Sequence, residues 1–201
     1  MGVKKNKDFR LQVPGGETTV LLHTCCAPCS SAIIEAMMKD GITPVIYYCN
    51  PNIYPLEEYE IRKNECTRYA RSLGLEIVDA DYDHENWLDA VKGLEGEPER
   101  GGRCLRCFKI RLLRTARYAA QRGIRVITTT LASSRWKSLD QINEAGRWAC
   151  QQMVPPDGKV IWWDHNWRKN GLQERRLQII KEYDFYNQLY CGCEFSMRKE
   201  D

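Results

Sequence analysis

No run of about eighteen apolar residues occurs anywhere in the 201-residue sequence, and its first sixteen residues are polar and basic. We therefore expect a cytoplasmic protein with no membrane partner. Internal repeats, low-complexity segments and linkers are also absent, while the proportions of hydrophobic (43%) and charged (28%) residues are ordinary for a globular protein. We expect a flexible basic segment over residues 1–16 and a single α/β domain over 17–201.

Glycine is missing from residues 21–38, LLHTCCAPCSSAIIEAMM, where many α/β nucleotide-binding proteins have a glycine-rich phosphate loop. Three cysteines stand there instead, Cys25, Cys26 and Cys29. Without glycines, the backbone cannot approach a phosphate closely. This absence weighs against ATP binding of the pyrophosphatase type.

Apolar runs alternate with amphipathic stretches along most of the chain. We expect strands over residues 18–24, 44–49, 75–82 and 125–131, and helices over residues 30–39, 55–73, 85–94, 104–121 and 139–151. Such alternation predicts a doubly wound, mostly parallel sheet with helices on both faces. Ligands of such sheets bind beyond the carboxyl ends of the strands.

Polar side chains follow several predicted strands and are candidates for binding a polar ligand at that edge. They are Asn50, Asn52, Tyr54, Ser133, Arg135, Lys137, Asp164 and Arg168. Each alone is equally typical of a turn or a helix cap. Their shared placement after predicted strands distinguishes them from ordinary turn residues.

The ten cysteines give the sharpest signal. Seven fall into three clusters, which are CCAPC (Cys25, Cys26, Cys29), CLRC (Cys104, Cys107) and CGC (Cys191, Cys193). Cysteines three residues apart at a helix start lie on one face, so two such pairs give four thiolates, which suit either zinc or a [4Fe–4S] cluster. The number of thiolates does not distinguish a zinc ion from a cluster. Seven clustered thiols are more than the four ligands of one zinc site, however, and this favours a redox role. Cys66 and Cys150 are expected to pack in the core.

Carboxylates are absent from residues 100–125, which contain eight arginines and one lysine. Such a run is most often a solvated helix face. With tryptophans in neighbouring loops, it also suits a phosphate backbone and unstacked bases. A zinc-stabilised RNA-binding module therefore stays open as an alternative.

The motifs LLHTCCAPCS, CNPNIYPLEEYEIRKNE, GGRCLRCFKIRL, TTLASSRWKS and YCGCEFS together resemble the cobalamin-independent epoxyqueuosine reductases, the QueH family. The resemblance extends in order from about Thr18 to Ser196. It implies an α/β fold related to the HUP nucleotide-binding superfamily. It also implies reduction of epoxyqueuosine to queuosine at the wobble position of tRNA, with electrons from a separate donor.

The same resemblance implies roles for the clustered cysteines. Cys25, Cys26, Cys104 and Cys107 match the positions of [4Fe–4S] ligands. Cys29 matches a position where some members have aspartate, which suggests a ligand to a mononuclear iron. The CGC pair matches a redox-active disulfide or part of a second metal site. An ATP-dependent tRNA-modifying enzyme of the related pyrophosphatase fold is the remaining alternative.

Overall fold

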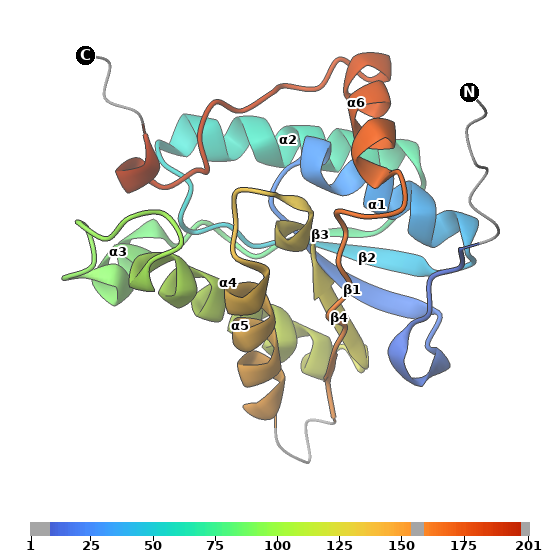
Figure 1. The fold of residues 1–201 in the computed structure, drawn as a ribbon, viewed down its shortest axis with the longest axis horizontal. Helices are drawn as coiled ribbons and strands as arrows, with labels where there is room; N and C mark the ends of the chain where they lie inside the picture. The colour runs from blue at the N-terminus through green and yellow to red at the C-terminus, as the bar shows by residue number, and fades with distance from the viewer. Residues whose placement is uncertain (1–8, 154–158, 198–201) are drawn as a thin grey trace.

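A five-stranded, wholly parallel sheet forms the centre of the computed structural model, which describes residues 9–153 and 159–197 (Figure 1). The strand order is β3-β2-β1-β4-β5. The strands are β1 (Thr19–Thr24), β2 (Thr43–Tyr48), β3 (Ile77–Asp79), β4 (Val126–Thr129) and β5 (Ile161–Trp162). The expected doubly wound parallel sheet is therefore confirmed.

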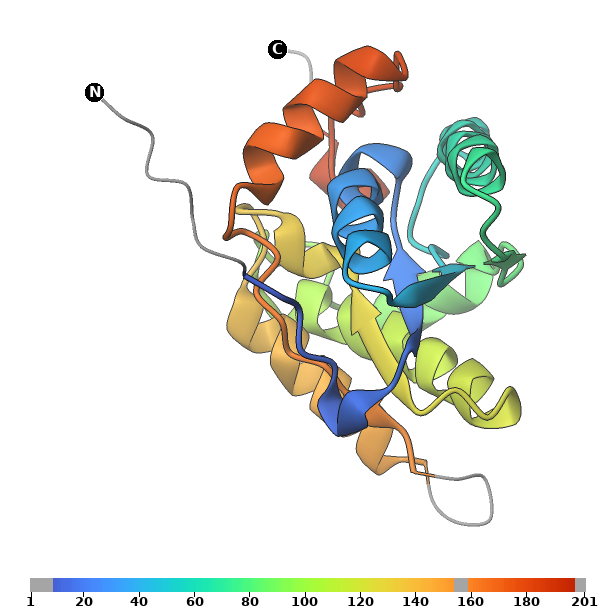
Figure 2. The ribbon, with the colours of Figure 1, turned by 90° about the vertical axis from the view of Figure 1, so that its right-hand side faces the viewer.

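Helices cover both faces of the sheet, as the two perpendicular views show (Figures 1 and 2). One face carries α1 (Ala27–Lys39), α2 (Leu56–Ser72) and α6 (Leu172–Glu182). The other carries α3 (His84–Val91), α4 (Gly102–Gln121) and α5 (Leu139–Gln151). Three short 3-10 turns complete the described elements, η1 (Pro14–Gly16), η2 (Thr130–Ser133) and η3 (Glu194–Ser196).

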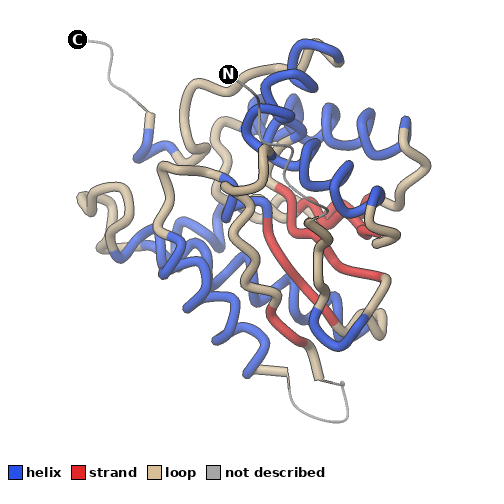
Figure 3. Tube along the Cα trace, turned by 45° about the vertical axis from the view of Figure 1, so that its right-hand side comes forward, coloured by secondary structure: helices blue, strands red, loops and turns tan. Residues whose placement is uncertain are grey.

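The burial of each strand follows its place in the sheet. β1 lies between β2 and β4, and Val20 to Thr24 are all buried, as expected for a parallel strand covered on both faces. β3 at one edge is only partly buried. The short strands lie close together between the helical layers (Figure 3). β1 is therefore well covered, and it leads directly into the thiol-rich turn.

The element boundaries agree with the sequence prediction in most places. The helix expected over 85–94 ends earlier, at Val91. The helix expected from residue 30 begins at Ala27, which puts Cys29 in its first turn. The strand expected over 75–82 is limited to Ile77–Asp79 at the sheet edge, and the one expected over 125–131 ends at Thr129, where η2 begins. Helix α6 was not predicted, because only Ile179 among its residues is fully buried.

The amino-terminal segment joins the fold before residue 17. Leu11 and Val13 pack against the core, and the Leu11 amide donates to Asp40 at 2.6 Å. Residues 9–16 run beside the segment that follows β5 (Figure 2), where the rings of Phe9 and His165 lie 6.0 Å apart. Residues 1–8 of the expected flexible segment lie outside the described residues. None of the described helices is both long and apolar enough to span a bilayer.

Gly146 provides a test of how α5 packs on the sheet. A Cβ atom at this position would overlap the Trp162 indole, whose Nε1 donates to Asn143 at 3.1 Å. We expect Gly146→Ala to lower the free energy of unfolding by about 1–3 kcal/mol, because overpacking outweighs the better helix propensity of alanine. Urea denaturation measures the change. Gly96→Ala is the control, since its Cβ would meet nothing within 4 Å; equal effects of both substitutions would contradict the packing argument.

Candidate metal centre

Three thiols converge at the start of α1. Thr24 ends β1, Cys26 is the N-cap residue of α1, and Cys29 lies in the first turn. The sulfur atoms of Cys25, Cys26 and Cys29 all lie within 4.8 Å of one another. No side chain caps this helix start, so its amide groups and dipole favour negative charge on the sulfurs. The expected grouping of the CCAPC cysteines is therefore present and can hold a metal ion.

The three thiols share their protons unequally. Hydrogen bonds from the Cys26 and Cys29 thiols lower the pKa of Cys25 well below its usual value. Burial and the neighbouring Cys25 thiolate raise the pKa of Cys26. The pKa of Cys29 rises to about 12, chiefly through its hydrogen bond to Cys25. In the metal-free site one thiolate is thus stabilised by two thiols, and a bound cation would favour ionisation of all three.

A second group of thiols links the start of α4 to the carboxyl-terminal segment. Cys104 and Cys107 lie in the first two turns of α4, and Cys107 shares an apolar cluster with Cys193 and Trp87. Cys104, Cys191 and Cys193 line one small cavity. Cys191 and Cys193 are free thiols here, the first exposed and the second buried.

Gly192 lets the CGC turn pack closely. Its φ is +130°, a conformation that favours glycine. A Cβ atom there would approach Ile53, Asn52 and Arg62 to within 3.1–3.3 Å. A glycine between Cys191 and Cys193 is therefore required by both the backbone and the packing.

Two cations lie near both thiol groups. Arg111 is 2% exposed, and no carboxylate lies within 4.0 Å of its guanidinium in the described part of the chain. Burial acts to lower its pKa, but the neighbouring Cys107, Cys25 and Cys191 act in the opposite direction and raise it. The pKa of Lys137 is also raised. Burial acts to lower it, but the neighbouring Cys191, Cys25 and Cys29 act more strongly in the opposite direction. Both cations are therefore matched to negative charge on the sulfurs.

Buried polar groups join the strand ends beneath the thiols. Arg111 donates to the Cys49 carbonyl at 3.2 Å and to the Asn50 side-chain oxygen. Asn50 donates to the Thr24 carbonyl at 2.9 Å, and the two nitrogens of His23 lie 2.7 Å from Thr129 Oγ1 and 3.0 Å from the Cys49 carbonyl. These contacts fix the ends of β1, β2 and β4 relative to one another.

The segment after α6 lies against the same thiols. Gln188 Nε2 lies 3.2 Å from the Cys26 sulfur and 3.9 Å from that of Cys29. Arg62 on α2 donates to the carbonyls of Tyr190 and Cys191, each at 3.3 Å, and pairs with Glu58 at 2.6 Å. The buried Arg62–Glu58 pair thus fastens the CGC turn to α2.

The polar residues expected to bind substrate occupy different environments. Asn50, Asn52 and Ser133 are buried, whereas Tyr54 and Arg135 are exposed. Asn50 and Ser133 are engaged in hydrogen bonds within the fold, the latter to the Thr130 carbonyl.

Of these residues, Lys137 lines the small cavity with Cys104, Cys191 and Cys193. Arg168 donates to the Lys137 carbonyl at 2.8 Å and so supports this loop. Asp164 is exposed and pairs with Arg147 at 3.7 Å. This ion pair therefore faces α5 and not a thiol.

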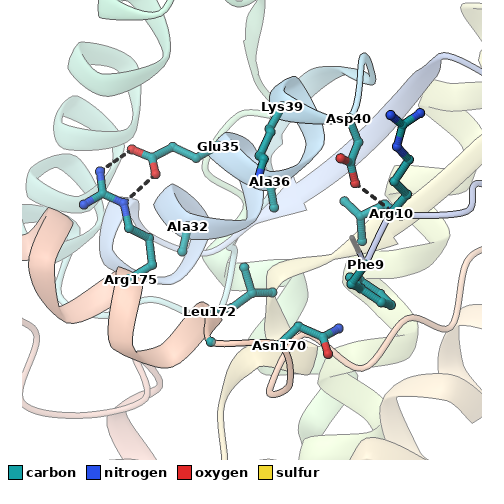
Figure 4. Close-up of a pocket in the computed structure, with 12 residues that line it drawn as sticks. Phe9, Arg10, Ala32, Glu35, Ala36, Lys39, Asp40, Asn170, Leu172 and Arg175 are labelled. Atoms are coloured by element: carbon teal, nitrogen blue, oxygen red, sulfur yellow. Dashed lines mark hydrogen bonds and ion pairs between the residues drawn. The ribbon is translucent and has the colours of Figure 1, made fainter. Parts of the chain in front are cut away.

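A larger cavity of about 810 Å³ lies away from the cysteines, between residues 9–11, α1 and α6 (Figure 4). Among its charged groups, Arg175 holds Glu35 through two hydrogen bonds of 2.7 and 2.8 Å. Asp40 accepts the Leu11 amide. No cysteine lines this cavity, so it is separate from the thiol site.

Sequence reasoning missed Arg111 and Gln188. Arg111 had a readable signal, because it lies four residues after Cys107 and therefore on the same helix face. Gln188 had none, since it belongs to an irregular segment. Cys66 is buried in the core, as expected, while Cys150 is only partly buried against it.

Known proteins share this chain's sequence over most of its length. The family model described as "Epoxyqueuosine reductase QueH" matches residues 20–199. The protein of that name from Haemophilus influenzae is 48% identical over 94% of this chain and 76% of its own length. Those from Acinetobacter baylyi (45%; 94% and 85%) and Thermotoga maritima (35%; 89% and 90%) are also similar.

The buried His23 leads to a pH prediction for the metal-free protein. Burial lowers the pKa of His23 to about 3, and the charge of Arg111 acts in the same direction. We expect its ring signals in NMR spectra, assigned with His23→Gln, to stay those of neutral imidazole from pH 8 to pH 5. The unfolded chain takes up this proton below about pH 6.5 and the native protein does not. His23 should therefore reduce the free energy of unfolding by up to about 1.4 kcal/mol per pH unit as the pH falls from about 6.5 to about 3. A ring titrating near pH 6.5 would contradict the burial argument.

Proposed function

Because this chain belongs to the epoxyqueuosine reductase QueH family of oxidoreductases, we propose that it converts epoxyqueuosine to queuosine at the wobble position of tRNA. The observation that carries the proposal is the presence of two thiol groups around the buried Arg111 and the partly buried Lys137. A purely structural zinc site needs four ligands and does not require cations beside them. This arrangement suits a negatively charged, redox-active centre.

The reaction is a two-electron deoxygenation. Both C–O bonds of the epoxide break, a carbon–carbon double bond forms, and the oxygen leaves as water after taking up two protons. The two electrons come from an external donor. A [4Fe–4S] cluster, when bound, supplies electrons singly, and a second iron supplies a Lewis acid for the epoxide oxygen.

The donor set fits such metals. We assign Cys25, Cys26, Cys104 and Cys107 to the cluster and Cys29 to a second iron, on the resemblance of their motifs to those of the family. Cys191 and Cys193 are assigned as a redox pair or as ligands to the second metal. Their shared cavity with Cys104 supports a place beside the cluster.

The chain's own groups hold charge and protons in this site. Lys137 keeps its ammonium proton because the thiolates raise its pKa. Arg111 neutralises negative charge from beneath while its hydrogen bonds to Cys49 and Asn50 keep it in place. Gln188 donates toward Cys26, and hydrogen bonds to cluster sulfurs are one determinant of reduction potential.

Single cysteine substitutions test the proposal. Anaerobically reconstituted protein, supplied with dithionite and tRNA carrying epoxyqueuosine, should release nucleosides in which epoxyqueuosine has lost one oxygen atom by mass spectrometry. We expect Cys25→Ala and Cys104→Ala to lower turnover by more than about 100-fold, because loss of a metal ligand exceeds the 10–100-fold effect typical of an outer-shell partner.

Cys150→Ala is the matched control, since that thiol is outside both groups and should leave turnover within about twofold of the parent. Iron and labile sulfide are measured on the same samples. Undiminished turnover in the Cys25→Ala, Cys104→Ala double variant would overturn the ligand assignment. Stoichiometric zinc without iron or sulfide would favour the zinc-stabilised RNA-binding module instead.

A further inference from the structure

Trp136 is the one tryptophan that the described residues leave open to solvent. Its exposed fraction is 65%, whereas Trp87, Trp163 and Trp167 are between 0 and 4% exposed. Trp148 and Trp162 are partly buried against the core. A tryptophan is normally well buried, and this exposed one also lines a cavity with cysteines, which makes it a candidate contact surface.

The loop that carries Trp136 is fixed in position. Arg100 donates to the Trp136 carbonyl at 3.0 Å and to the Arg135 carbonyl at 3.1 Å. The Arg100 carbonyl in turn accepts from Gln141 at 2.8 Å, and the Trp136 amide donates to Ser134 at 3.3 Å. Arg100 adopts φ +67°, a conformation that is uncommon outside glycine and that these contacts maintain. The exposed indole is therefore held by a pre-organised backbone.

The same contacts place the indole beside the thiols. The amide of Arg100 donates to the Cys104 sulfur at 3.3 Å. Trp136 and Lys137 line one cavity together with Cys104, Cys191 and Cys193. A molecule whose reactive part reaches these thiols would therefore have its neighbouring atoms against the Trp136 ring.

Charge next to the ring identifies the class of partner. The Arg135 guanidinium lies 4.8 Å from the Trp136 ring centre and is exposed. Within residues 9–153 and 159–197, no carboxylate pairs with Arg135 or Arg100. A flat aromatic face beside a free guanidinium matches an unstacked base with its phosphate, as in single-stranded RNA.

We propose that Trp136 is the stacking platform for a nucleobase next to the modified nucleoside in the anticodon loop, with Arg135 contacting the adjoining phosphate. This inference rests on the proposed function, because the modified nucleoside must reach the thiols for its neighbour to lie on the indole. It assigns Trp136 to binding and not to electron transfer.

Binding of an unmodified anticodon stem–loop RNA to the reconstituted protein tests the platform without requiring turnover. We expect Trp136→Ala to weaken binding by about 5- to 150-fold in fluorescence anisotropy, and Trp136→Phe to stay within about fivefold of the parent. Met38→Ala is the control. Met38 is also exposed, at 40%, but lies near the opposite end of α1 from Cys26.

Kinetics with epoxyqueuosine-containing tRNA and dithionite complete the test. Trp136→Ala should raise KM by a similar factor and leave kcat within about threefold. Unchanged RNA affinity in Trp136→Ala would overturn the platform. Loss of turnover with a protein reductant but not with dithionite would instead assign this surface to the electron donor. If the parent protein binds the RNA through Trp136 but never deoxygenates the substrate, the proposed function fails while the RNA contact stands.

Discussion

A buried guanidinium that has no carboxylate partner among the described residues is the constraint around which this site is organised. Arg111 holds the Cys49 carbonyl and the Asn50 side chain, and Asn50 holds the Thr24 carbonyl. Removing a cation from water is costly unless opposite charge lies nearby. In the described residues that charge is available from the cysteines, so the strand ends and the thiols depend on the same side chain.

Several features of the site follow from this arrangement. Cys25, Cys26 and Cys29 lie together at the start of α1, where the dipole favours thiolates. Helix α4 presents Cys104 and Cys107 on the face that also carries Arg111. The carboxyl-terminal segment completes the site by bringing Gln188 and the CGC turn against these thiols. Positive charge therefore lies beneath the thiols, while the exposed indole of Trp136 and the guanidinium of Arg135 stand at their edge.

Periodicity predicted the regular elements well and the irregular ones poorly. The helix over residues 139–151 has the boundaries that were expected, because its apolar spacing and its Ser138 cap are local signals. Helix α6 escaped prediction because it packs through few apolar residues and is rich in charge. The cysteine motifs indicated a metal centre. The fixing of the strand ends by Asn50, which the sequence suggested as a substrate contact, depends on tertiary packing that no local pattern encodes.

The role of the buried Arg111 cation is tested most directly by the rise in melting temperature on anaerobic reconstitution with iron and sulfide. This rise is compared between the parent, Arg111→Lys and Arg111→Met. If thiolate charge compensates Arg111, the parent should gain most, because a ligand that binds the native state stabilises it more as its affinity rises. Arg111→Lys should gain less, and Arg111→Met least, with a matching fall in bound iron. An equal gain in stability and equal iron content in Arg111→Met would contradict the central role of this buried cation.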